Sequence, residues 1–132
     1  MYDKFEVHTN EHSCLIDVTP QVERTIRRKG IEEGVCYIFV PHTTAGVTIN
    51  ENADPTVKSD LLRELGRIVP WSDNYSHSEG NSAAHIKASM VGASQIVLVS
   101  QGRLQLGTWQ GIYFAEFDGP RTREVWVKIL GE

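Results

Sequence analysis

Residues 35–40 form the segment that most constrains the fold of this chain. Their sequence, Val-Cys-Tyr-Ile-Phe-Val, is nearly continuous in apolar side chains. A strand with one face in water alternates polar and apolar residues, whereas a strand covered on both faces does not. The run therefore predicts a central strand that is buried on both faces of its sheet.

Six further strands are expected from apolar or alternating segments bounded by turn residues. They cover residues 5–9, 14–18, 46–50, 96–100, 111–117 and 124–130. The first two strands flank a turn at residues 10–12 and look like a hairpin. The last two are joined by a turn at residues 118–121.

Three helices complete the predicted elements. The first has Thr19 as its N-cap, Pro20 in its first turn and Gly30 at its end. The second begins at Asp54-Pro55. Its core side is formed by Val57, Leu61, Leu62, Leu65 and Ile68. The third covers residues 82–91.

These elements predict an α+β fold. We expect a single domain over residues 1–132, in which a mostly antiparallel β-sheet packs against two or three helices. A chain of 132 residues is long enough to bury a core of its own.

Composition and charge narrow the class of protein. The net charge of −4 argues against non-specific nucleic-acid binding, which needs clustered positive charge. No apolar run approaches the roughly 20 residues of a membrane helix, and the N-terminus lacks the pattern of a signal peptide. We therefore expect a cytoplasmic protein without a membrane or nucleic-acid partner. Cys14 and Cys36 lie in predicted strands and are most simply buried free thiols.

Three of the five histidines lie beside turn residues and other polar groups. His77 and His85 are eight residues apart, which is not the four-residue spacing of two metal ligands on one helix face. His42 follows the predicted central strand. If a loop, a helix and a strand end bring these three together, their neutral nitrogens could hold a divalent metal. The alternative for His42 is a side chain that only hydrogen-bonds a nearby loop.

The segment between His77 and His85 has two interpretations. Glu79 could orient a metal-bound imidazole ring or cap the following helix. Gly80 and Asn81 come directly before that helix, where free backbone N–H groups favour an anion such as phosphate. An ordinary helix cap is the alternative.

Two more polar segments could contribute to a site. Glu51 and Asn52 offer hard oxygen ligands of the kind that suit Mg²⁺, while Asp54 caps a helix. Residues 102–111 contain three glycines and Trp109. They form either a flexible loop that places the indole over a ligand or a hairpin with Trp109 in the core. Arg121 and Arg123 place two guanidinium groups at a turn, which suits phosphate recognition, but both could equally face solvent.

Six blocks of residues, in this order, resemble the YjbQ family, also called the secondary thiamine-phosphate synthases. The blocks are His42-Thr43-Thr44-Ala45-Gly46, Asn50-Glu51-Asn52-Ala53-Asp54-Pro55, His77-Ser78-Glu79-Gly80-Asn81, Ala84-His85, Leu106-Gly107-Thr108-Trp109-Gln110-Gly111 and Asp118-Gly119-Pro120-Arg121. The resemblance extends over essentially the whole chain. It implies a compact α+β protein, a homotrimer with polar residues near the subunit boundaries and, in some members, a bound metal.

The same resemblance implies a weak thiamine-phosphate synthase activity, which need not be the main role of the family. The reaction joins a hydroxymethylpyrimidine pyrophosphate to a thiazole phosphate and releases pyrophosphate. A divalent metal, Zn²⁺ or Mg²⁺, would be held by His42, His77 and His85, and Glu51 would transfer a proton or contact Mg²⁺. Phosphate contacts would come from Gly80, Asn81, Thr108 and Arg121, with Trp109 stacked on an aromatic ring of the substrate.

Two other functions are compatible with these residues. A three-histidine metal site with an open position would also activate water, as in a hydrolase of a small phosphorylated metabolite. A ligand-binding protein without catalytic activity is the second alternative.

Overall fold

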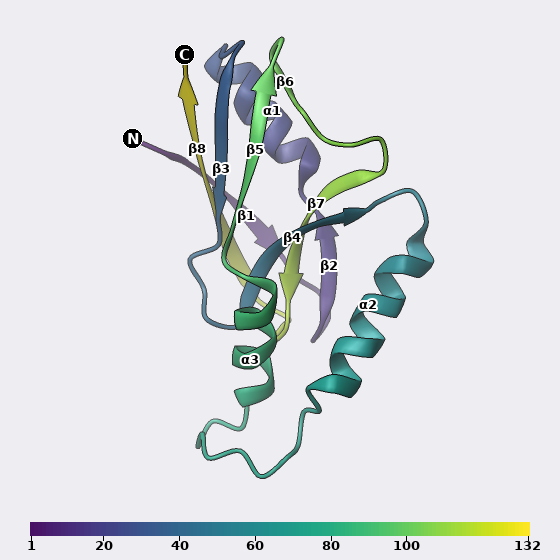
Figure 1. Cartoon of the computed structure of the whole chain (residues 1–132). Helices are drawn as coiled ribbons and strands as arrows, with labels where there is room; N and C mark the ends of the chain where they lie inside the picture. Colours follow the sequence, from purple (N-terminus) through teal and green to yellow (C-terminus); the bar gives the residue numbers. More distant parts are fainter.

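The computed structural model describes all 132 residues and contains eight strands and three helices (Figure 1). The strands are β1 (Asp3–His8), β2 (Cys14–Asp17), β3 (Gly34–Phe39), β4 (Ala45–Glu51), β5 (Ser94–Ser100), β6 (Arg103–Leu104), β7 (Gln110–Glu116) and β8 (Thr122–Gly131). The helices are α1 (Thr19–Lys29), α2 (Pro55–Ile68) and α3 (Ser82–Val91).

The strands form two sheets in which every pairing is antiparallel. The larger sheet has the strand order β1-β8-β3-β5-β6, and the smaller sheet has the order β2-β7-β4. The predicted α+β class with a mostly antiparallel arrangement is confirmed, and β3 is central as expected.

The predicted N-terminal hairpin is wrong. β1 pairs with β8 of the larger sheet, whereas β2 pairs with β7 of the smaller one. Val7 of β1 belongs to the core between the sheets, while Leu15 of β2 packs in a second apolar cluster. Residues 9–13 therefore cross from one sheet to the other instead of turning back along β1.

The main core lies between the two sheets. Ile38 and Val127 of the larger sheet meet Val47 and Phe114 of the smaller one, and all four are almost fully buried. α1 closes part of this core with Val22 and Ile26. Burial of such side chains is the main stabilising contribution in a domain of this size.

The second cluster lies on the other face of the smaller sheet, which α2 and α3 cover (Figure 1). Ala84 and Ala88 of α3 pack against Ala115 and Phe117. α2 packs more loosely, since none of its residues is buried. Ile68 was expected on its core side but is 58% exposed.

Gly46 allows the end of α3 to lie on β4. A Cβ atom at this position would stand 2.5 Å from the Gly92 carbonyl oxygen, which accepts a hydrogen bond from the Val47 N–H at 3.0 Å. Only glycine permits this backbone approach. The contact fixes α3 relative to the sheet.

One face of β3 is uncovered, contrary to the prediction that both faces are buried. Cys36 and Ile38 face the core, while Tyr37 and Phe39 point outward and are 40% and 43% exposed. Neighbouring apolar residues extend this exposed area. We define the outer sheet face as Tyr37, Phe39, Ile96, Leu98 and Leu130, all of them exposed. The apolar run in the sequence is thus explained only in part by the single chain.

The helix ends follow the predicted signals with one change. Gly30 ends α1 in the left-handed conformation, with φ of 68°, and Asp54 caps α2 by accepting the Thr56 N–H at 2.9 Å. Thr19 is not the N-cap of α1. Its hydroxyl oxygen accepts the Ile112 N–H, and its own N–H is accepted by Asp17. No helix is long and apolar enough to cross a membrane.

The two cysteines are free, as expected. Cys36 is fully buried, and burial raises the pKa of its thiol to about 12. Cys14 is only partly buried. Cys36 is therefore a protonated core residue with no nucleophilic role at neutral pH.

Candidate functional site

A polar pocket brings the three predicted histidines together. It has a volume of about 580 Å³ and lies where the β3–β4 connection, the segment before α3 and the start of β8 meet. Its chemically important residues are His42, His77, Glu79, Asn81, His85, Arg121 and Arg123. We call this set the histidine pocket. The sequence-based expectation that His42 meets the 77–85 segment is met.

His42 uses one ring nitrogen within the fold. Its Nε2 accepts the backbone N–H of Glu124 at 2.9 Å. Burial and, secondly, the Arg123 guanidinium lower the pKa of His42, so the ring is neutral at pH 7. Because Nε2 accepts, the neutral ring carries its proton on Nδ1. His42 therefore offers the pocket a donor rather than a free lone pair.

His77 and His85 lie next to each other. Their ring centroids are 5.3 Å apart, and the ring planes are nearly perpendicular. His77 Nε2 is 3.9 Å from Glu79 Oε1, an exposed and therefore weak contact. Both rings can supply lone pairs to a divalent metal.

The residues fit a metal only in part. No group of three or more His, Cys, Asp or Glu side chains is arranged to hold a metal ion. Since the free nitrogen of neutral His42 is protonated, His77 and His85 are the two ring donors suited to a metal here.

Two arginines make the pocket suitable for an anion. The Arg121 guanidinium is held by Asp118, whose Oδ2 accepts from Nη2 at 2.8 Å, and whose backbone carbonyl accepts from Nε at 2.8 Å. Arg123 is 4% exposed and donates from Nε to Glu116 Oε1 at 2.9 Å and from Nη2 to Thr44 Oγ1 at 2.8 Å. Its Nη1 makes no hydrogen bond within the chain.

Both arginines of this turn were noted for phosphate recognition, but a phosphate contact was predicted for Arg121 alone. The available signal for Arg123 was its spacing from Arg121, because residues two apart in an extended segment point to the same side. Its partner Glu116 is fully buried. Burial alone would raise the pKa of Glu116, but hydrogen bonds from Arg123, the Asp118 N–H and Thr9 outweigh it and lower the pKa. Both members of this buried pair are therefore charged.

Gly80 does not reach the pocket. Its N–H donates to the His77 carbonyl oxygen at 3.2 Å, and its φ of 78° belongs to a tight turn. Asn81 does line the pocket, directly before α3, but its side chain does not cap the helix. The first N–H groups of α3 are therefore not capped by this side chain.

Glu51 and Trp109 lie in a separate depression with Ile49, Asn50 and Gln110, which we call the Trp109 surface. β4 runs from the histidine pocket to this surface, so the two are about 20 Å apart along a strand of this length. Glu51 Oε2 accepts the Ala53 N–H at 2.9 Å. Trp109 is 62% exposed, so its alternative placement in the core is wrong. Thr108 is exposed and does not line the histidine pocket.

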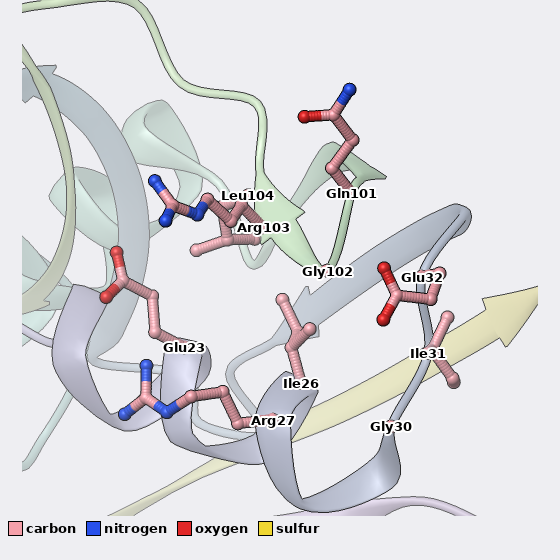
Figure 2. Close-up of a pocket in the computed structure, with 10 residues that line it drawn as sticks. All are labelled: Glu23, Ile26, Arg27, Gly30, Ile31, Glu32, Gln101, Gly102, Arg103 and Leu104. Carbon is pink, nitrogen blue, oxygen red and sulfur yellow. The ribbon is translucent and has the colours of Figure 1, made fainter.

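A larger pocket, of about 660 Å³, lies beside α1 (Figure 2). Glu23 and Arg27 project from α1, Glu32 comes from the segment after the helix, and Arg103 comes from β6. It contains no histidine. Size alone thus favours this pocket, whereas the chemistry of the side chains favours the histidine pocket.

The fold and the pocket define a class: a small α+β protein of two antiparallel sheets, with imidazole and guanidinium groups gathered at one end. The chain belongs to the UPF0047 YjbQ-like family, since the family model matches residues 3–132. UPF0047 protein YugU of Bacillus subtilis is 53% identical over 99% of this chain and 100% of its own length. UPF0047 protein MJ1081 of Methanocaldococcus jannaschii is 52% identical, over 100% and 96%.

Solved structures show the same fold. An uncharacterised protein of the YjbQ/UPF0047 family from Clostridium acetobutylicum superposes with a TM-score of 0.95 at 50% identity, over 97% of this chain and 99% of its own. The hypothetical protein APE1520 from Aeropyrum pernix gives a TM-score of 0.95 at 36% identity, over 100% and 99%.

Proposed function

We propose that the histidine pocket binds a phosphorylated small molecule and catalyses a reaction of the thiamine-phosphate synthase type. In this reaction a pyrimidine pyrophosphate joins a thiazole phosphate and pyrophosphate leaves. The observation that carries the proposal is the meeting of two guanidinium groups and three imidazoles in one pocket. A cytoplasmic location forms part of the proposal.

The leaving group sets the main electrostatic demand. As the bond from the methylene carbon to the pyrophosphate oxygen breaks, negative charge develops on the pyrophosphate. Arg121 is oriented by Asp118, and Arg123 is held by Glu116, so neither guanidinium has to reorganise during the reaction. Preorganised charge of this kind stabilises a transition state efficiently.

His42 adds a directed donor. Its Nδ1–H is available to a phosphate oxygen because Nε2 is fixed on the Glu124 N–H. His77 and His85 remain free to accept a proton from the second substrate or from water.

A divalent metal, Zn²⁺ or Mg²⁺, belongs to the proposal through His77 and His85. When bound, it would supply further positive charge to the leaving group. His42 would join such a centre only after releasing the Glu124 N–H.

We further propose that the chain works as a homotrimer. The outer sheet face leaves five large apolar side chains in water, which is typical of a protein interface. Phe39 belongs to both this face and the histidine pocket, so a second copy seated there lies beside the pocket. Glu51, Thr108 and Trp109 keep their proposed roles only if a second copy brings its Trp109 surface to the pocket.

The direct test mixes the purified protein with the pyrimidine pyrophosphate and the thiazole phosphate and measures thiamine phosphate and pyrophosphate. We expect both products, and at least about a tenfold loss in Arg121→Gln. His8→Ala, at an exposed histidine outside the pocket, is the matched control and should retain activity. Pyrophosphate release without the thiazole phosphate would instead indicate a hydrolase, and binding without any product a ligand-binding protein.

A further inference from the structure

Asn81 has a fixed orientation at the edge of the histidine pocket. Its Nδ2 donates to Asp118 Oδ2 at 2.9 Å. An ionised carboxylate only accepts hydrogen bonds, so the amide nitrogen has to face Asp118 and the amide oxygen has to point away from it.

The amide oxygen of Asn81 has no partner. Asn81 is only 7% exposed, and its Oδ1 is buried without a hydrogen bond. Buried polar atoms are nearly always paired, and an unpaired acceptor is costly. Helix capping does not account for this oxygen, because the Asn81 side chain makes no cap hydrogen bond, whereas Asp54 caps α2 from the corresponding position.

The side chain that carries this unpaired acceptor lies close to Arg121. Asp118 Oδ2, which binds the Asn81 amide, also accepts from Arg121 Nη2 at 2.8 Å. Asp118 Oδ2 thus orients both side chains: Asn81, whose amide oxygen lacks a donor, and Arg121, which is proposed to bind an anion.

We propose that Asn81 selects ligands that carry a hydroxyl or amino group next to their phosphate. The inference rests on the anion-binding role proposed for Arg121 and adds the second half of the ligand. The phosphate contacts Arg121, and the neighbouring donor group pairs with Asn81 Oδ1. A site that hydrogen-bonds a hydroxyl or amino group of its ligand binds a ligand without this group more weakly. The buried polar atom of the site is then left unpaired.

Isothermal titration with two probes tests this selection. 2-Hydroxyethyl phosphate and ethyl phosphate carry the same anion and differ by one hydroxyl group. We expect the protein to bind the hydroxyl compound about tenfold more tightly. In Asn81→Leu, and in the smaller Asn81→Ala should the first variant not fold, the two affinities should agree within about twofold. Asn10→Leu, at an exposed asparagine outside the pocket, should keep the preference.

The outcomes separate the two proposals. Equal binding of both probes by the unaltered protein would overturn the role of Asn81 and leave the anion site intact. A preference that persists in Asn81→Leu would overturn it as well. If the protein prefers 2-hydroxyethyl phosphate only when Mg²⁺ is added, Asn81 Oδ1 contacts the metal and not the hydroxyl group. That result would contradict the inference. Binding of neither probe would remove the anion site on which the inference rests.

Discussion

Arg123 and Glu116 form a buried ion pair directly behind the histidine pocket. Arg123 Nε donates to Glu116 Oε1 at 2.9 Å, and the two residues are 4% and 0% exposed. Thr9 and the Asp118 N–H also donate to the Glu116 carboxylate, and Thr44 accepts from Arg123. The pair ties β7, β8 and the β3–β4 connection together where the pocket forms.

Removing one charge of this pair should strongly destabilise the protein. Glu116→Gln keeps the shape of the side chain but leaves the Arg123 guanidinium buried without its counter-charge. We expect the free energy of unfolding in urea to fall by about 3–5 kcal/mol. Glu64→Gln removes an acid from the exposed Arg67 pair and serves as the control, with little expected change. Equal stability of Glu116→Gln and the unaltered protein would contradict the described pairing.

The lowered pKa of His42 predicts a loss of stability in mild acid. The unfolded chain binds a proton at this residue near pH 6.5, whereas the folded chain does so only at lower pH. Between the two pKa values the unfolded state holds more protons, so stability falls as the pH drops through this window. Urea unfolding at pH 7.5, 6.5 and 5.5 should show a shallower decline for His42→Gln than for the unaltered protein. His8→Gln should follow the unaltered protein, and parallel curves for all three would contradict the prediction.

The tautomer of His42 predicts unequal roles in metal binding. Titration of Zn²⁺ should give clearly weaker binding for His77→Ala and His85→Ala, because each variant removes one of the two ring donors. His42→Gln should bind Zn²⁺ like the unaltered protein, because Nε2 is occupied by the Glu124 N–H. Equal losses in all three variants would show that His42 is a ligand. Unchanged affinity in all three would remove the metal from the proposal.

The outer sheet face predicts self-association. Ile96→Lys places a charge among Tyr37, Leu98 and Leu130 and should convert the proposed trimer to monomers in sedimentation velocity. Ile68→Lys is a matched control, since Ile68 is exposed to a similar extent, 58% against 61%, but lies on α2 away from this face. A monomeric unaltered protein, or a trimer that survives Ile96→Lys, would contradict the assignment of this surface.

Much of the secondary structure was predictable because its signals are local. Gly30 ends α1, Asp54 caps α2, and residues 82–91 form α3 as expected. The pairing of the first two strands was not predictable from their turn, since β8 and β7 are distant in sequence. The apolar run at residues 35–40 predicted that both faces of β3 are buried, whereas the chain covers only one of them.

The residue types of the site were predictable, but which of these residues share one pocket was predictable only in part. His42, His77, His85 and Arg121 meet as expected. Glu51 and Trp109 occur in equally suggestive motifs but lie at the other end of β4. Nothing in the spacing of the histidines indicates that the Glu124 N–H occupies His42 Nε2, because that contact arises only when β8 reaches the β3–β4 connection.

The most direct test of the central claim is the affinity of the protein for pyrophosphate, measured by isothermal titration. We predict that the unaltered protein binds pyrophosphate and that Arg121→Gln weakens binding about tenfold to a hundredfold, the effect of losing a hydrogen bond to a charged group. Arg103→Gln, in the larger pocket beside α1, should leave the affinity unchanged (Figure 2). Unchanged affinity in Arg121→Gln, or a loss in Arg103→Gln instead, would contradict an anion site at the histidine pocket.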